Sequence, residues 1–403
     1  MRIAYLHYLV DDDTGRHHVR QFAEAAAGLG HEIDVRGMNL APSGPQDGAG
    51  APPSARLRAA LKRRFAWLLH EPKEILWNAR YVRAETDLLG TLRPDVLLVR
   101  DHLLTASCVP VARRLSLPLV LELNAPADEA RLYLREYLHV PGVARAIERY
   151  KLRRADAVTV VSSTLKRLLV DTYGLDPGRV AVVPNGADLV RFHPAVRPDP
   201  GIRFPPGTSP IIGFVGSFRR WHGTDLMVRM AREVGAARPS AGFLLVGDGP
   251  EARAVQEALR PLGARVVLTG RVPHARVPGL TAAFDIGVLP ETLFYASPLK
   301  VVEWMAAGRS VVAPGYEALG DLVEDGKEAI LFRPGDGDDL VRSVLRLVDD
   351  PALRARLAAA ASARAAQRLS WSENARRVLV ACEAARARAA QRAQPPDRSH
   401  RPA

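Results

Sequence analysis

The sequence predicts an α/β protein made of two doubly wound, Rossmann-like domains. Short apolar runs alternate with helical patterns, and this alternation stops once, at a proline-rich stretch, and then restarts. Alternating strands and helices favour parallel sheets that are covered by helices on both faces. With 403 residues, 47% of them hydrophobic, each half of the chain can bury a core of its own.

The first half contains six short apolar runs that are typical of buried strands. They cover residues 2–8, 32–37, 95–100, 117–123, 157–162 and 179–184. Helical patterns lie between most of them, as in residues 16–29 and 143–154. We therefore expect an N-terminal domain over residues 1–193.

The stretch 194–210 holds six prolines, which lack the N–H that helix and strand interiors need, so it is expected to be a linker. Six further apolar runs follow it, at residues 211–216, 242–247, 265–270, 285–290, 310–314 and 329–332. They predict a C-terminal domain over residues 211–371. A final helix is expected at 372–392, and a disordered tail at 393–403.

The composition limits which partners and which cellular compartment we expect for the protein. The net charge of +12 comes mostly from arginines spread along the chain, and no nucleic-acid-binding motif accompanies them, so no nucleic-acid partner is expected. No run of eighteen apolar residues is present to span a membrane. Two cysteines are too few for a disulfide framework, and the N-terminus lacks a signal-peptide pattern, which together predict a cytoplasmic protein.

Four strand ends in the second half carry glycines or charged residues, and doubly wound sheets bind ligands beyond such carboxyl ends. These ends are residues 215–225 (with Gly216, Arg219, Arg220, His222 and Gly223), 246–251 (with Gly247), 268–274 (with Arg271 and Val272) and 295–308 (with Leu299). Because they converge on one edge of one sheet, they predict a sugar-nucleotide site.

The stretch 295–308 has the pattern of a helix start, with Ser297 expected to cap the helix and Pro298 expected at its first position. Lys300 falls in the first turn, where the helix dipole disfavours a cation. A diphosphate bound at the free N–H groups would offset that cost. One turn further on, Glu303 is suited to accept hydrogen bonds from ribose hydroxyls.

Several segments occur in the order typical of one family. They are "TGRHHVRQFAEAAAGLGHEIDV" (14–35), "VVPNGADLVRFHP" (182–194), "FVGSFRRWHG" (214–223), "LLVGDGPE" (244–251), "DIGVLPE" (285–291) and "KVVEWMAAGRSVVA" (300–313). Through them the chain resembles the GT-B glycosyltransferases of family 4. The resemblance implies sugar transfer from a nucleotide-sugar with retention at the anomeric carbon. It also implies a last helix that crosses back to the N-terminal domain.

The resemblance also implies site residues. Glu303 matches the second of the family's two glutamates, whereas Tyr295 stands where the first belongs. Asn124 stands where many relatives have a histidine after a first-domain strand, and it is expected at the catalytic centre. Gly15 and Asn185 are expected on the acceptor side, where the family brings the main chain close to the substrates.

The phosphate-binding loop departs from the family pattern. Ser217 and His222 stand in place of the usual arginine and lysine. Arg219 or Arg220 in the same loop is therefore expected to supply the positive charge, because an arginine fork suits phosphate. We favour Arg219 and Lys300 as the phosphate ligands, with His222 in a supporting role.

No metal or other cofactor is expected, because the N–H groups and the cations can hold the phosphates. The run 11–13 ("DDD") is the weaker alternative, as a metal site. Residues 54–70 form a basic amphipathic pattern, which would either dock on an anionic membrane or pack on the first domain. The acceptor is accordingly expected to be a glycan, a lipid-linked molecule or a small molecule.

Two other classes of protein fit the sequence. The missing first glutamate is compatible with a catalytically inactive GT-B partner that binds a nucleotide. A sugar-nucleotide epimerase would have the same fold and a similar site. The sequence does not determine the sugar, the base or the acceptor.

Overall fold

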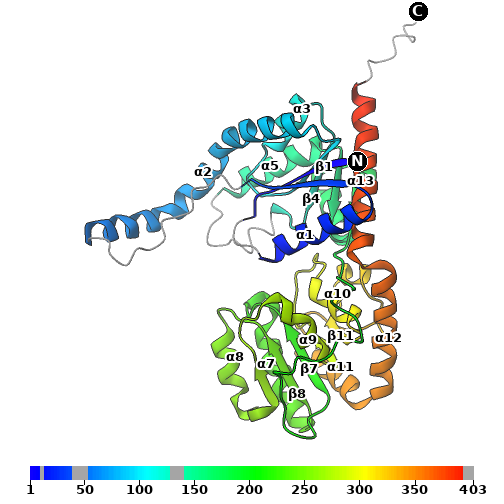
Figure 1. The fold of residues 1–403 in the computed structure, drawn as a ribbon. Helices are drawn as coiled ribbons and strands as arrows, with labels where there is room; N and C mark the ends of the chain where they lie inside the picture. The colour runs from blue at the N-terminus through cyan, green and yellow to red at the C-terminus, as the bar shows by residue number, and fades with distance from the viewer. Residues whose placement is uncertain (10–12, 39–52, 128–139, 394–403) are drawn as a thin grey trace, which may run out of the picture. The chain divides into compact units, whose positions relative to one another are not determined.

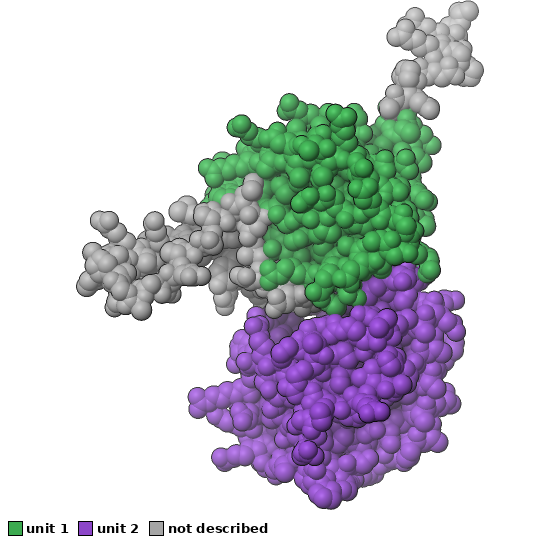
Figure 2. Space-filling model, viewed as in Figure 1, with its two compact units in different colours: residues 1–160, 165–183, 375–403 green, residues 161–164, 184–374 purple. Residues whose placement is uncertain are grey.

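The computed structural model describes the main chain of residues 1–9, 13–38, 53–127 and 140–393, with the side chains in these ranges except 13–14, 53–70 and 393. The chain divides into two compact units (Figure 2). Unit 1 comprises Met1–Val160, Leu165–Val183 and Ala375–Ala403, and unit 2 comprises Val161–Thr164 and Pro184–Asn374.

The expected linker, residues 194–210, contains neither helix nor strand. It belongs to unit 2, together with residues 184–193, which the sequence had assigned to the N-terminal domain. Asp199 in this stretch pairs with Arg276, and its main-chain N–H donates to the carbonyl of Gly279 at 2.9 Å. The stretch is therefore fastened along unit 2 by contacts that its composition does not indicate.

Unit 1 is built on a parallel six-stranded sheet with the order β2-β1-β3-β4-β5-β6. Its strands are β1 (Arg2–His7), β2 (Glu32–Gly37), β3 (Val96–Arg100), β4 (Leu119–Leu123), β5 (Ala157–Val160) and β6 (Val180–Val182). All six strands predicted in the first half of the sequence form.

Helices surround the unit 1 sheet, and the N-terminal part of one of them, α2, extends away from it (Figure 1). They are α1 (Asp13–Gly28), α2 (Pro53–Leu92), α3 (Cys108–Arg114), α5 (Pro141–Arg154), α6 (Ser163–Tyr173) and α13 (Trp371–Ala393). From Ala375 onwards α13 belongs to unit 1, where Leu379 and Cys382 share a buried cluster with Ile3 and Val96. The last helix thus contributes directly to the core of unit 1. No helix within the described residues is long and apolar enough to cross a membrane.

Unit 2 contains a second parallel six-stranded sheet, with the order β12-β11-β10-β7-β8-β9. Its strands are β7 (Ile211–Val215), β8 (Gly242–Val246), β9 (Val266–Leu268), β10 (Ile286–Val288), β11 (Ser310–Pro314) and β12 (Ile330–Phe332). The six strands predicted in the second half are therefore also confirmed. The strand order reverses between β7 and β10, which is where such sheets open a crevice for a ligand.

The helices of unit 2 are α7 (Thr224–Ala237), α8 (Ala252–Leu259), α9 (Val277–Ala282), α10 (Leu299–Ala306), α11 (Gly337–Asp349) and α12 (Pro351–Arg368). Among them, α10 is buried on nearly every side, and Val301, Val302 and Trp304 are fully buried. Gly287 of β10 makes room for it, because a Cβ there would lie 2.6 Å from the Trp304 ring. This packing fixes α10, and with it the direction of its few polar side chains.

Candidate functional site

The polar residues of unit 2 meet at the point where its strand order reverses. The loop after β7 contains Gly216 and the short 3-10 helix η2 (Arg220–His222). The chain after β10 leads into α10 and carries Lys300. Because β7 and β10 are adjacent strands, the two connections flank one crevice.

Lys300 is half-buried in the first turn of α10, as the sequence predicts. Its Nζ lies 4.7 Å from the centre of the Phe214 ring and 3.5 Å from Nε2 of His222. A Cβ on Gly216 would lie 2.5 Å from the same Nζ, so any larger residue there would displace the ammonium group from this position. Burial lowers the pKa of Lys300 to about 8, although the nearby charge of Glu303 acts to raise it. Lys300 is therefore a cation at pH 7, and its environment would favour an added anion.

His222 is held as a neutral group beside Lys300. Its Nδ1 lies 2.6 Å from the carbonyl oxygen of Ser217. Because a carbonyl only accepts, Nδ1 carries the proton and Nε2 presents its lone pair to Lys300. Burial, followed by the charge of Lys300, lowers the pKa of His222 to about 4. His222 therefore orients the Lys300 ammonium and adds no positive charge of its own.

The main chain of Gly216 and Gly247, at two of the glycine-rich strand ends, forms a surface without side chains, here called the glycine floor. Gly247 has a φ of +133°, and a Cβ there would lie 1.9 Å from the carbonyl oxygen of Gly216. The N–H of Gly216 donates to the carbonyl of Val246 at 2.9 Å. After β9, Arg271 is exposed and Val272 packs on the core. The predicted glycine-rich ends thus lie together, with Arg271 at the rim.

The start of α10 differs by one position from the sequence prediction. Pro298 is the N-cap residue and Leu299 is the first helical residue, so the prediction that Ser297 caps the helix was wrong. The Ser297 hydroxyl instead accepts from the N–H of Asn185 at 3.0 Å, and the Asn185 side chain donates to the carbonyl of Ser297 at 2.6 Å. Asn185, expected on the acceptor side, lies in unit 2 and fixes the chain that leads into α10.

Glu303 is 8% exposed and lies one turn after Lys300. Burial raises its pKa to about 8, with Arg191 and Lys300 opposing the rise and Asp188 adding to it. Within the described part of the chain, no hydrogen bond reaches its carboxyl group. The carboxyl is thus a buried acceptor available to a ligand.

Arg191 and His274 join this site, and sequence reasoning missed both. The Arg191 guanidinium lies 3.0 Å from Nδ1 of His274 and donates to its carbonyl oxygen at 2.8 Å. A ring nitrogen of His274 lies within 4.8 Å of a Glu303 carboxyl oxygen. The motif "NGADLVRFHP" contained Arg191, but nothing in its local pattern indicated a contact with residue 274.

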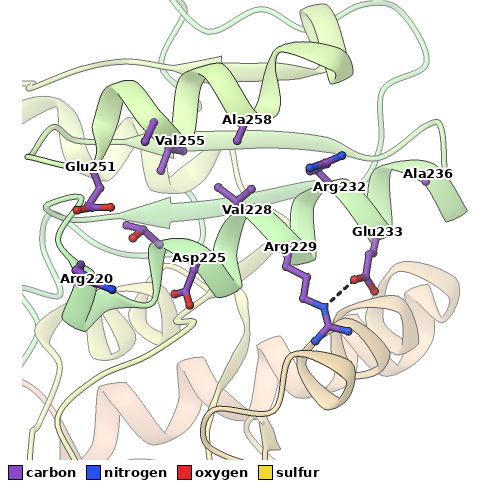
Figure 3. Close-up of a pocket in the computed structure, with 12 residues that line it drawn as sticks. Arg220, Asp225, Val228, Arg229, Arg232, Glu233, Ala236, Glu251, Val255 and Ala258 are labelled. Atoms are coloured by element: carbon purple, nitrogen blue, oxygen red, sulfur yellow. Dashed lines mark hydrogen bonds and ion pairs between the residues drawn. The ribbon is translucent and has the colours of Figure 1, made fainter.

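The two arginines of the loop lie in different surroundings. The Arg219 guanidinium lies over the Trp221 ring at 4.9 Å, and its charge contributes to the lowered pKa of His222. Arg220 instead lines a groove between α7 and α8, beside Asp225 and Glu251 (Figure 3). Only Arg219 is therefore placed to act near Lys300.

This placement predicts unequal effects of two substitutions. If Arg219 binds phosphate, as the sequence predicts, Arg219→Ala should lower kcat/KM roughly tenfold, because it would remove about one charge-assisted hydrogen bond. Arg220→Ala should change it less than about twofold, since Asp225 and Glu251 face Arg220 in the groove. Steady-state kinetics with varied donor compares them. An Arg220→Ala loss that equals the Arg219→Ala loss would contradict the assignment.

The position of the family's first glutamate is filled by a core residue. The Tyr295 ring is 1% exposed, and its carbonyl accepts from the Ser162 hydroxyl at 2.7 Å. Glu291 lies next to Gly223 instead, since a Cβ on Gly223 would lie 2.8 Å from that of Glu291. Neither residue therefore takes the place of the missing carboxylate beside Glu303.

In unit 1, Asn124 follows β4 and donates to Glu122 at 2.9 Å. Glu122 is buried, which by itself raises its pKa, but His18 at 3.0 Å and the adjacent Arg100 hold that pKa well below its usual range. Gly15 is buried in the first turn of α1. The side chains of 11–13 and of 54–70 lie outside the described residues, although α2 includes the whole of 54–70.

Both halves of the chain match known protein families. Residues 209–350 match the family model described as glycosyl transferases group 1, and residues 15–191 match that of glycosyltransferase family 4. A 2-deoxystreptamine N-acetyl-D-glucosaminyltransferase of Streptomyces fradiae is 30% identical, over 71% of this chain and 70% of that relative. A D-inositol 3-phosphate glycosyltransferase of Nocardiopsis dassonvillei is 30% identical, over 74% and 75%. The chain spans only 55% of a third relative, the 2-deoxystreptamine glucosyltransferase of Streptomyces kanamyceticus, at 32% identity.

Solved structures share the fold at lower identity. Sucrose-phosphate synthase from Thermosynechococcus elongatus aligns with a TM-score of 0.70 and 19% identity, over 94% of this chain and 98% of that one. HepE of Anabaena, solved in complex with UDP, aligns with a TM-score of 0.67 and 18% identity, over 94% and 99%. The two parallel sheets match the same architecture. The chain therefore belongs to the group 1, family 4 glycosyltransferases of the GT-B fold.

Proposed function

We propose that this protein is a retaining glycosyltransferase that moves a sugar from a nucleotide-sugar donor to an acceptor hydroxyl. One observation gives this proposal its main support. The Lys300 ammonium group, a cation at pH 7, lies beside the glycine floor and the first N–H groups of α10. A diphosphate is the ligand that such a site would stabilise.

Each residue of the site has a role in this proposal. Lys300, Arg219 and the N–H groups of Leu299 and Lys300 hold the donor phosphates. Glu303 accepts hydrogen bonds from the ribose hydroxyls, and the nearby charge of Arg191 favours its carboxylate form. Asn185 and His222 position these groups through the contacts described above.

The chemistry then rests on stabilising the leaving group. The bond between the anomeric carbon and the phosphate oxygen breaks, while the acceptor oxygen bonds to the same face of that carbon. The acceptor proton passes to the departing phosphate oxygen. The cations and N–H groups stabilise the charge that develops on the diphosphate, and no divalent metal is needed for this step.

The acceptor that we propose to test first is a small polyhydroxylated carbocycle. Two relatives at 30% identity are named for such rings, 2-deoxystreptamine and D-inositol 3-phosphate. Glycan and lipid-linked acceptors are the alternatives. Contact of residues 54–70 with an anionic membrane would favour the lipid-linked class.

The experiment is nucleotide release from UDP-, GDP-, ADP- and TDP-sugars, with and without candidate acceptors. The proposal expects acceptor-dependent turnover that EDTA leaves unchanged, and NMR of the product should show the anomeric configuration of the donor. Interconversion of the donor sugar without acceptor would indicate an epimerase. Donor binding without any turnover would indicate an inactive partner. Loss of transfer on chelation, with rescue by Mn²⁺ or Mg²⁺, would restore 11–13 as a metal site.

Glu303→Gln should weaken donor binding by an amount that grows with pH. The pKa of Glu303 is raised to about 8, so the carboxyl is largely neutral at pH 6.5, where Gln resembles it, and becomes a carboxylate at higher pH. The expected loss is roughly tenfold at pH 8.5, from hydrogen bonds to a charged acceptor, and less than about threefold at pH 6.5. Calorimetry with the preferred donor measures both.

Thermal unfolding provides the control for this variant. A raised carboxyl pKa means that the folded state keeps a proton which the unfolded chain loses near pH 4.5. The wild type should therefore lose stability as pH rises from about 4.5 to about 8, and Glu303→Gln should lack that loss. Equal donor affinity of both proteins at pH 8.5 would remove Glu303 from the site.

A further inference from the structure

A separate cavity of about 680 Å³ lies in unit 1. It is formed where β4, β5 and β6 begin, which is the edge of the sheet opposite to the carboxyl ends of the strands. The last residues of α3, α5 and α13 border it. Its volume falls within the range of small-molecule sites.

The side chains that line this cavity carry an excess of positive charge. Six arginines line it, namely Arg113, Arg153, Arg154, Arg179, Arg388 and Arg392, together with a single carboxylate, Asp156. The whole chain has 56 basic and 44 acidic residues, so composition does not account for this ratio. The three helix C-termini contribute roughly half a negative charge each. Between about three and four positive charges are left uncompensated.

Neutral groups hold several of these arginines in place. Arg179 donates to the carbonyl of Ala155, and Arg388 donates to the carbonyl of Gly178 at 2.7 Å. Such bonds cap the ends of helices and loops, and they fix the guanidinium groups without neutralising them. Burial, followed by the charge of Arg388, lowers the pKa of Arg179, as expected where like charges are crowded.

Five of the six arginines have no carboxylate partner within the described residues, and two of these five, Arg113 and Arg154, also donate to no main-chain carbonyl there. Arg113 forms no ion pair within the described residues, and Arg154 lies over the Tyr150 ring at 4.2 Å. Arg392, in contrast, is paired with Asp156, which also accepts from the N–H of Leu119 at 2.9 Å. Arg113 and Arg154 therefore keep donors available for a ligand.

We propose that this pocket binds an anion that carries two or more phosphate groups. Guanidinium groups bind phosphate oxygens in pairs, and the arginines already held by carbonyl groups lose little entropy on binding. The cavity is much larger than a single phosphate needs. The ligand is either a free phosphorylated molecule or the headgroup of a phosphorylated lipid, and the proposal is independent of the function proposed for unit 2.

The test is calorimetric titration of the full-length protein with inorganic tripolyphosphate at low salt. The double variant R113Q/R154Q should weaken binding at least tenfold, because it removes the two arginines whose donors are engaged neither by a carboxylate nor by a carbonyl. R114Q is the matched control, since Arg114 is the exposed neighbour of Arg113 on α3 and does not line the cavity. Unfolding curves of all three proteins establish that they are folded.

Tripolyphosphate can also bind at the phosphate site that we propose in unit 2. Each titration is therefore repeated with proteins that carry K300M. Binding that survives K300M and is lost in R113Q/R154Q supports the pocket. No binding by the K300M protein, or equal binding by R113Q/R154Q and R114Q, overturns it. Sedimentation with phosphatidylcholine vesicles, with and without phosphatidylinositol 4,5-bisphosphate, separates the two sources. Vesicle binding that R113Q/R154Q abolishes assigns a lipid headgroup, and tripolyphosphate binding without vesicle binding assigns a free anion.

Discussion

Lys300→Met is expected to lower kcat/KM on the order of 100-fold while the protein stays folded. In the proposed function the ammonium group is a preorganised cation where charge develops on the departing diphosphate, and removing one such contact typically costs two to three orders of magnitude. Met keeps the length of the side chain and its packing against Phe214. Steady-state kinetics with varied donor concentration measures the loss.

The stability of the same variant separates this role from misfolding. The pKa of Lys300 is lowered from 10.5 to about 8, so below pH 8 the folded state carries a buried charge at a cost. Lys300→Met should therefore be at least as stable as the wild type at pH 7. The difference in donor affinity between the wild type and Lys300→Met should become smaller above pH 8, where the wild-type lysine also becomes neutral. Lys327→Met is the matched control, because Lys327 is exposed and pairs with Glu324. Unchanged kcat/KM in Lys300→Met would show that the phosphates bind elsewhere.

Gly247→Ala is expected to destabilise the protein by about 4 kcal/mol and to abolish donor binding. The new Cβ would lie 1.9 Å from the carbonyl oxygen of Gly216, and a main-chain atom cannot move aside as a flexible side chain can. The φ of +133° adds strain for any residue with a side chain. Such an overlap belongs to the few mechanisms that cost more than about 4 kcal/mol. Denaturant unfolding measures the change.

Gly263→Ala provides the comparison. Gly263 also has a positive φ, +61°, but nothing lies within 4 Å of a Cβ placed there. That variant should lose only about 1–2 kcal/mol, the cost of the left-handed conformation. If both alanine variants are equally stable, the close approach of the Gly216 and Gly247 main chains does not constrain this site.

The sequence by itself determined the elements and one edge of the donor site. Both sheets follow from local patterns, since runs of apolar residues mark buried parallel strands wherever they occur. The position of Lys300 in the first turn of a buried helix also follows from its near neighbours. The glycine-rich ends could be grouped because the carboxyl ends of parallel strands share one edge of a sheet.

Only the tertiary structure decided where the individual polar side chains act. Arg219 and Arg220 are adjacent in sequence, yet one lies beside the His222 site and the other lines the α7–α8 groove. Asn185 reaches Ser297 across 112 positions, and Arg191 reaches His274 across 83. The arginines of the unit 1 cavity come from four separate segments of the chain. Periodicity shows whether a residue faces the core or the solvent within its own helix or strand. The contacts named here join residues that are far apart in the sequence. They depend on how the sheets and helices pack, which a local pattern does not contain.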